Sequence, residues 1–154
     1  MYTSESLALA LLEKMAHLRD YQQLLNAFVA VRAAFDEQLV RELEVFQPAR
    51  RHRRTKLSEP PLGEDPNSPW TLQIDETDIT TTVYGDWKAV SSRSKTQALG
   101  DKWARSRISP VLQVPSIILP IEHNYLINPE HQDFEEIRVY DPEDLPIDPR
   151  LTEG

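Results

Sequence analysis

The sequence contains no cysteine, which excludes disulfide bonds and thiol chemistry within this chain. It has 4 glycines beside 12 prolines, so we expect stiff connections and short secondary-structure elements. No apolar run reaches the roughly 18 residues that a membrane-spanning helix needs. No basic segment precedes the first apolar stretch, as it would in a signal peptide. These absences lead us to expect a cytoplasmic protein that has no membrane partner.

Excess positive charge is also missing. The chain has 17 Lys and Arg against 25 Asp and Glu, a net charge of −8. A general polyanion binder should carry a basic surface, so we expect no direct nucleic-acid partner. The length of 154 residues suits one domain. A domain of this size buries roughly 70% of its unfolded surface, which is enough for a real core.

Motifs for metal and nucleotide chemistry are absent as well. The four histidines are scattered without the spacing of a metal site, so we expect no metal. The chain also lacks a phosphate loop, a GxGxxG fingerprint and a GxSxG nucleophile elbow. Trp70, Trp87 and Trp103 are more typical of a hydrophobic core than of ligand stacking.

What is present predicts an α+β fold. Residues 4–18 should form a helix that is apolar nearly all round and therefore buried, with Thr3 or Ser4 as its cap. A second helix is expected over 94–106, and 123–129 is interpreted as a compact turn. Residues 39–46 fit either a strand or a helical turn. Strands are expected over 27–35, 70–74, 80–84, 111–114, 116–119 and 137–140. Because strands outnumber helices in a mixed order, α+β is the expected class.

One segment departs from this pattern. Residues 47–69 are rich in proline, charge and turn formers, which predicts a long exposed loop or flexible insertion within a domain that spans 1–154. The basic run at 50–54 within it fits either phosphate or nucleic-acid binding or a solvated charge run. The acidic residues that follow it and the net charge of −8 favour the solvated run.

Two features could carry chemistry. Glu13 ends an apolar run in the first helix, and His17 lies one turn later on the same side. A carboxylate there is either held in a cleft or part of an ordinary surface pair. The hydroxyl groups of Ser91, Ser92, Ser94 and Thr96 precede or open the second helix. They fit either phosphate binding at a helix N-terminus or simple capping.

Five blocks give the sequence a resemblance to a known family. They are 2–13 (YTSESLALALLE), 95–103 (KTQALGDKW), 111–116 (VLQVPS), 124–131 (NYLINPEH) and 147–151 (IDPRL). They occur in the same order as in RES-domain proteins and cover nearly the whole chain apart from the insertion. The sequence therefore resembles a RES domain.

The resemblance implies a fold of the ADP-ribosyltransferase type, with mixed sheets and a few packed helices. It also implies a toxin that degrades NAD by hydrolysis or phosphorolysis of the nicotinamide–ribose bond. NAD would then be a substrate, and no cofactor is expected. The expected partners are an Xre-type antitoxin and a second copy of the chain in a homodimer.

The resemblance also assigns roles to residues. Glu13 corresponds to the family's helix glutamate, which is expected to hold the ribose hydroxyl and stabilise the positive charge that develops as nicotinamide leaves. Tyr2 corresponds to a tyrosine that lines the nicotinamide pocket. Thr96, with Ser94 as the alternative, corresponds to a hydroxyl that contacts NAD. The block at 124–129 is interpreted as structural turn chemistry.

Family members have a segment before this tyrosine with arginines that are expected to grip the NAD diphosphate. This sequence begins at Met1 and Tyr2, so the resemblance implies an N-terminally incomplete RES domain. Two hypotheses follow. The first is an NAD-cleaving toxin, and the second is an inactive RES-like fragment that serves as an antitoxin-binding module.

Overall fold

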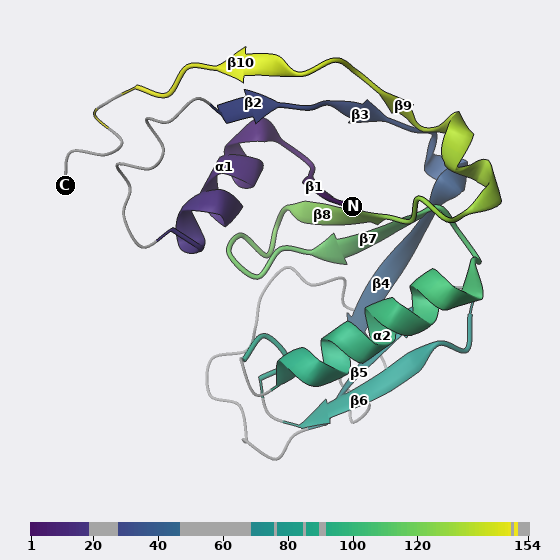
Figure 1. The fold of residues 1–154 in the computed structure, drawn as a ribbon. Coiled ribbons are helices and arrows are strands. Elements are labelled where there is room, and N and C mark those ends of the chain that lie inside the picture. Colours follow the sequence, from purple (N-terminus) through teal and green to yellow (C-terminus); the bar gives the residue numbers. More distant parts are fainter. Residues whose placement is uncertain are drawn as a thin grey trace.

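The computed structural model describes residues 1–18, 28–46, 69–75, 77–84, 86–89, 92–148 and 150. Its main feature is a six-stranded sheet in the order β1-β8-β7-β4-β5-β6, in which only β4 and β7 pair in parallel (Figure 1). Two helices, α1 (Leu7–Ala16) and α2 (Arg93–Ser106), accompany it. The six strands are β1 (Tyr2–Ser4), β4 (Val40–Phe46), β5 (Pro69–Ile74), β6 (Thr80–Tyr84), β7 (Val111–Pro115) and β8 (His123–Ile127). The predicted α+β class is confirmed.

Two short antiparallel ribbons complete the described fold. β2 (Phe28–Ala30) pairs with β10 (Glu143–Leu145), and β3 (Ala33–Ala34) pairs with β9 (Arg138–Val139). The two ribbons run along the top of the molecule in Figure 1, above β8. Two 3-10 helices, η2 (Glu37–Leu39) and η4 (Gln132–Glu136), lie where these segments join the main sheet.

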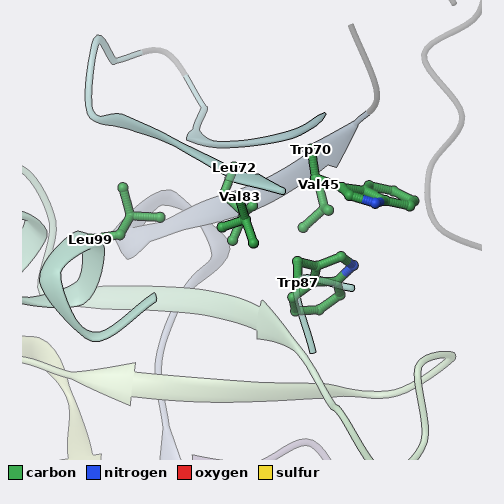
Figure 2. Close-up of a cluster of buried hydrophobic side chains, with 6 residues drawn as sticks. All are labelled: Val45, Trp70, Leu72, Val83, Trp87 and Leu99. Carbon is green, nitrogen blue, oxygen red and sulfur yellow. The ribbon is translucent and has the colours of Figure 1, made fainter. Parts of the chain in front are cut away.

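The core under α2 follows from alternation along the hairpin of β5 and β6. Trp70, Leu72 and Ile74 are buried, while the intervening Thr71 and Gln73 are partly exposed. The buried side chains meet helix α2 and its approach segment. Figure 2 shows one such cluster, formed by Val45, Trp70, Leu72, Val83, Trp87 and Leu99. The core role predicted for all three tryptophans is confirmed, since each is at most 7% exposed.

Strand β7 is covered on both faces. Val111 packs with Leu39, Ile127 and Ile137, on the side of the C-terminal segments. Its neighbour Leu112 packs with Ile74 and Trp103 of the opposite cluster. Successive side chains of a strand point to opposite faces, so β7 belongs to both halves of the core. This burial explains why the short apolar run was recognisable as a strand.

The C-terminal end of α2 is held by side chains from the segment after β8. Asn128 donates from Nδ2 to the carbonyl oxygen of Ala104 at 2.9 Å, and His131 contacts the carbonyl oxygen of Arg107 through Nε2 at 2.9 Å. Arg107 has a positive φ of 53°, the left-handed conformation that often ends a helix. The carbonyl groups that a helix end leaves unpaired therefore find partners here.

The first helix differs from its prediction in two ways. It begins at Leu7 and is capped by Ser6, whose hydroxyl oxygen accepts from the Leu9 backbone N–H at 3.1 Å. Thr3 and Ser4, the predicted caps, lie instead in β1, because this segment pairs with β8. The prediction that the helix is buried is also wrong. Leu9 is its buried residue, while Leu7 is 54% exposed and Leu12 is 38% exposed.

The region from 116 to 129 also differs. Residues 116–119 do not form a strand, because β7 ends at Pro115 and the chain turns there. The predicted turn at 123–129 is instead strand β8 over most of its length, and β8 pairs with β1 and β7 on its two edges. Local turn chemistry at Asn128 and Pro129 is real but covers only the end of the block. The long-range pairing could not be read from local composition.

The remaining strands agree with prediction, with shifted ends. The open choice at 39–46 is a strand, β4. The strand expected over 27–35 is divided into β2 and β3, and β10 was not predicted. The predicted insertion at 47–69 lies outside the described residues except for Pro69, which begins β5. Within the described part of the chain, no helix is long and apolar enough to cross a membrane.

Candidate functional site

Glu13 is directed at the sheet by its own helix. Leu9, with no exposed surface, anchors α1 against the rest of the fold. Glu13 lies four residues later, and residues at this spacing share one helix face. Glu13 therefore lies on the same side of α1 as the buried Leu9, which explains why it is partly buried. The contacts described next come from the sheet and from the turn after β7 and meet one oxygen of this carboxylate.

Asn124 of β8 donates to this carboxylate. Its Nδ2 lies 2.7 Å from Oε1 of Glu13, and its side chain is 2% exposed. The amide oxygen Oδ1 accepts from the Ser4 hydroxyl at 2.6 Å. Strand register explains the contact, because Ser4 and Asn124 are directly opposite in the β1–β8 ladder. The sheet thus presents an amide N–H to Glu13.

Ser116 provides a second donor to the same oxygen. Its hydroxyl lies 2.9 Å from Oε1 of Glu13, and the residue is fully buried. The Ser116 oxygen also accepts from the backbone N–H groups of Ile118 and Leu119, at 3.1 and 3.0 Å. These two acceptor contacts hold the turn after β7 and leave the hydroxyl proton for Glu13. With these two donors, Oε1 of Glu13 has its hydrogen-bonding capacity filled.

Tyr2 of β1 is the third partner. Burial, the charge of Glu13 and a hydrogen bond with Glu13 all raise the pKa of the Tyr2 hydroxyl above its ordinary value. At neutral pH it therefore stays a phenol that donates to the carboxylate. The residue is 56% exposed although its hydroxyl meets Glu13.

Neighbouring carboxylates are used differently. Glu122 accepts from the Ser6 hydroxyl at 2.9 Å through Oε2. Glu5 accepts from the backbone N–H of His123 at 2.9 Å and meets the ring nitrogen Nδ1 of His123 at 3.1 Å. These contacts tie the start of α1 to the start of β8. Glu13 is the carboxylate that receives donors from both the sheet and the turn after β7.

Thr96 and Ser94 are not joined to this group. Both lie in the first turns of α2, where the Thr96 hydroxyl donates to the carbonyl oxygen of Arg93 at 2.9 Å and Ser94 is exposed. Among the described residues, no hydrogen bond connects either one to Glu13 or Tyr2. One interpretation of the hydroxyl cluster was that it caps the second helix, and Ser94 is not at the cap position. The cap position belongs to Ser92, whose hydroxyl donates to the carbonyl oxygen of Asp86.

Helix α2 nevertheless approaches the face of the sheet that carries the site. Leu126 pairs with Tyr2 in one ladder and with Leu112 in the other, so these side chains share a face. A Cβ added at Gly100 of α2 would lie 3.9 Å from Cδ1 of Leu126. The helix with Ser94 and Thr96 thus covers the same face that presents Asn124 to Glu13.

Three members of this group were missed by the sequence analysis. Ser4 was assigned to a helix cap, Ser116 to a strand, and Asn124 to a turn. Ser116 and Asn124 each occur in blocks that carried the family resemblance, and that was the available signal. Their role requires the pairing of β8 with β1 and β7, which brings positions more than 100 residues from Glu13 into contact.

Chemically, the group is a fixed anion next to a half-exposed aromatic ring. Neutral donors orient the carboxylate, and within the described part of the chain Glu13 forms no ion pair with a cation. Such a charge can stabilise a cationic centre or accept a hydrogen bond from a ligand hydroxyl. Within the described residues, no group of three or more His, Cys, Asp or Glu side chains could hold a metal ion.

Comparison with known proteins points to one family. The family model of the RES domain matches residues 1–148. A protein named Toxin Res from Yersinia enterocolitica is 26% identical over 152 residues, which are 98% of this chain and 76% of that protein. The Prs ADP-ribosylating toxin of a Sphingobium species is 27% identical over 151 residues, which are 98% of this chain and 73% of that protein.

A third relative matches a shorter part. A Toxin Res from Photorhabdus laumondii is 37% identical over 83 residues, which are 53% of this chain and 53% of that protein. The mixed sheet with two helices and the name of the Sphingobium relative agree with the ADP-ribosyltransferase-like fold that the sequence led us to expect.

Proposed function

The chain belongs to the RES domain family, and on that premise we propose that it degrades NAD by cleaving the bond between nicotinamide and ribose. Two of the relatives are named toxins and a third an ADP-ribosylating toxin. The observation that carries the proposal is the Glu13 carboxylate, which three neutral donors hold beside the Tyr2 ring. The proposed context is a toxin in the cytoplasm.

The proposed reaction needs an anion at one place. As the bond between the ribose C1 and the nicotinamide nitrogen breaks, its electron pair leaves with nicotinamide, which departs as a neutral molecule. The ribose carbon and ring oxygen then share a positive charge, and Glu13 stabilises it while accepting a hydrogen bond from a ribose hydroxyl. Water or phosphate then adds to the carbon through oxygen and releases its proton. The products are nicotinamide and either ADP-ribose or its 1-phosphate.

Tyr2, Thr96 and Ser94 have the remaining roles in the proposed reaction. The ring of Tyr2 faces the positively charged nicotinamide of NAD, an arrangement that aromatic faces favour. Its hydroxyl stays protonated and steadies Glu13. Thr96, with Ser94 as the alternative, contacts the phosphate or ribose part of NAD from the start of α2, where free N–H groups favour anions. The contribution of these two hydroxyl groups stays a prediction.

The test is NAD consumption by the purified chain, with and without phosphate. We expect nicotinamide to be released as NAD disappears, measured by chromatography and mass spectrometry of the products. Release that needs phosphate identifies phosphorolysis, and release in its absence identifies hydrolysis. A folded chain that leaves NAD intact under both conditions would contradict the proposal.

A second candidate function is an antitoxin-binding module, and exposed apolar side chains favour a partner surface. Leu7 is 54%, Ile117 58% and Ile121 75% exposed. Leu7 and Ile121 are the chain neighbours of Ser6 and Glu122, which are hydrogen-bonded at 2.9 Å. Exposed apolar groups gathered in one place are typical of protein interfaces. We propose an Xre-type antitoxin as the partner, and a homodimer stays a prediction that light scattering can decide.

This surface predicts a separation of binding from catalysis. Ile121→Glu should weaken binding of an Xre-type antitoxin by about tenfold or more, because a buried charge without a partner is costly. NAD loss should be unchanged, since the Ile121 side chain is 75% exposed and is not one of the donors to Glu13. Calorimetry with purified proteins measures the affinity. Val139→Glu, an exposed position on β9, is the matched control. Equal affinities for the two variants would mean that the antitoxin binds at a surface that does not include Ile121.

A further inference from the structure

Asn124 has a feature that the proposed reaction does not yet use. It lies in β8, the strand that pairs with β1 on one edge and β7 on the other, opposite Ser4 and Val114. Its backbone position is therefore fixed from both sides. Its side chain is 2% exposed and bonded at both polar atoms. A buried amide with both ends satisfied has one orientation.

That orientation matters for the charge on Glu13. The Ser4 hydroxyl donates to Oδ1 of Asn124 at 2.6 Å, and Nδ2 of the same amide donates to Oε1 of Glu13 at 2.7 Å. The flipped amide would place its oxygen against the carboxylate, and two acceptors at that distance repel. The carboxylate, which only accepts, thus selects the amide orientation, and the Ser4 hydroxyl fills the amide oxygen in that orientation. We propose that Asn124 is a positioning residue for Glu13, and that the hydrogen bond from Ser4 holds its amide in place.

The other groups around Glu13 do not replace this contact. Ser116 reaches the same oxygen from the turn after β7, at 2.9 Å. Tyr2 is half-exposed, whereas Asn124 is enclosed and its donor is held by sheet pairing. The nearby carboxylates of Glu5 and Glu122 are engaged with His123 and Ser6. The amide is thus the donor that ties the Glu13 carboxylate to the rigid sheet.

The inference rests on the proposed function for its kinetic test. Asn124→Ala should lower kcat for NAD loss about 10- to 100-fold, the range of one hydrogen bond to a charged group. Ser4→Ala, on a less buried position, should lower it a few-fold, because the amide loses the partner of its oxygen and keeps its donor on Glu13. Circular dichroism and thermal melting show whether each variant is folded.

Asn124→Asp separates positioning from a merely structural role. It preserves the size of the side chain and places a second carboxylate against Glu13. Two carboxylates this close share a proton, and the shared proton restores a donor only when the pH is lowered. We expect this variant to be nearly inactive at neutral pH and to regain activity toward acid. A pH profile that keeps the wild-type shape at a uniformly lower level would overturn the positioning role.

A measurement without NAD keeps this inference separate from the proposed function. In ¹⁵N-labelled protein, the side-chain amide resonances of Asn124 should be identified by their loss in Asn124→Asp. They should move in Glu13→Gln and in Ser4→Ala, and should stay in place in Glu136→Gln, an exposed carboxylate in η4. Unmoved resonances in the first two variants would refute the contact even in a chain that cleaves NAD. Moved resonances in a chain that leaves NAD intact would support the contact and refute the proposed function alone.

Discussion

Glu13→Gln is expected to lower the rate of NAD loss on the order of 1,000-fold, the largest kinetic effect that we predict for this chain. A unit charge about 4 Å from a developing cation is worth about 4 kcal/mol at an effective dielectric of about 20. Since each 1.4 kcal/mol is about tenfold in rate, removing the charge costs about three powers of ten. Initial rates of nicotinamide release measure the effect.

The fold should survive this substitution. Glutamine has the shape of glutamate, and its amide oxygen can still accept from Ser116 and Asn124, which both bond to Oε1 in the wild type. The melting temperature should therefore change little. The loss then reports on charge alone, because the donors and the helix stay in place.

Two further variants make the result specific. Glu136→Gln removes the same charge at an exposed position in η4 and should leave the rate unchanged. Thr96→Val removes the hydroxyl that the family resemblance places at NAD, while α2 loses only a local bond to the carbonyl oxygen of Arg93. We expect a smaller loss for Thr96→Val than for Glu13→Gln, seen mainly as a higher KM. Full activity in Glu13→Gln would exclude the charge mechanism, whatever the other variants do.

The elements that were predicted well are those whose local residue pattern is enough to indicate their secondary structure. The hairpin of β5 and β6 alternates buried and exposed side chains, and α2 has its apolar positions at helical spacing. Trp103 was therefore placed in the core correctly. Tyr2 and Glu13 were expected together from the family resemblance, and the structure joins them.

The elements that were mispredicted depend on distant partners. Asn124 lies in a stretch with turn-forming neighbours, and only its pairing with β1 and β7 makes it a strand residue. Ser4 looked like a helix cap because a hydroxyl before an apolar run usually is one. Ser4 instead pairs with β8 as part of strand β1, so the helix begins later and Ser6 is its N-cap. Local patterns carry no information about such contacts.

The apolar character of α1 misled the prediction for a different reason. A helix that is apolar nearly all round is usually buried, yet Leu7 and Leu12 are exposed here. The side that carries Leu9 and Glu13 holds the buried residue of the helix and the carboxylate that meets β8. The surplus apolar surface is what a partner-binding protein would keep.

The second large effect is on stability, at Trp103. This residue is 3% exposed, packs with Ile74 and Leu112, and donates from Nε1 to the Ser109 hydroxyl oxygen at 2.9 Å. Trp103→Ala should lower the free energy of unfolding by about 3–5 kcal/mol, because the cavity spans the junction of α2 with β5 and β7. For a domain of this size that is a fall of roughly 6–20 °C in melting temperature, measured by calorimetry.

Trp103→Phe is the matched control. It keeps most of the apolar contacts with Leu112 and loses the indole donor, while the Ser109 hydroxyl keeps its bond to the carbonyl oxygen of Val111. The cost should therefore be clearly smaller than for alanine. Equal costs for the two variants would mean that the hydrogen bond, and not packing, holds α2 in place.

The same pair of variants separates stability from chemistry. Trp103 does not contact Glu13, Tyr2 or their donors, so the folded fraction of Trp103→Ala should cleave NAD at the wild-type rate well below its melting temperature. A loss of rate in protein that is still folded would mean that the position of α2 over Leu126 affects the reaction. Ser94 and Thr96 begin that helix, so a loss of rate that comes with a raised KM would support their contact with NAD. A loss in kcat alone would mean that α2 helps to place Glu13.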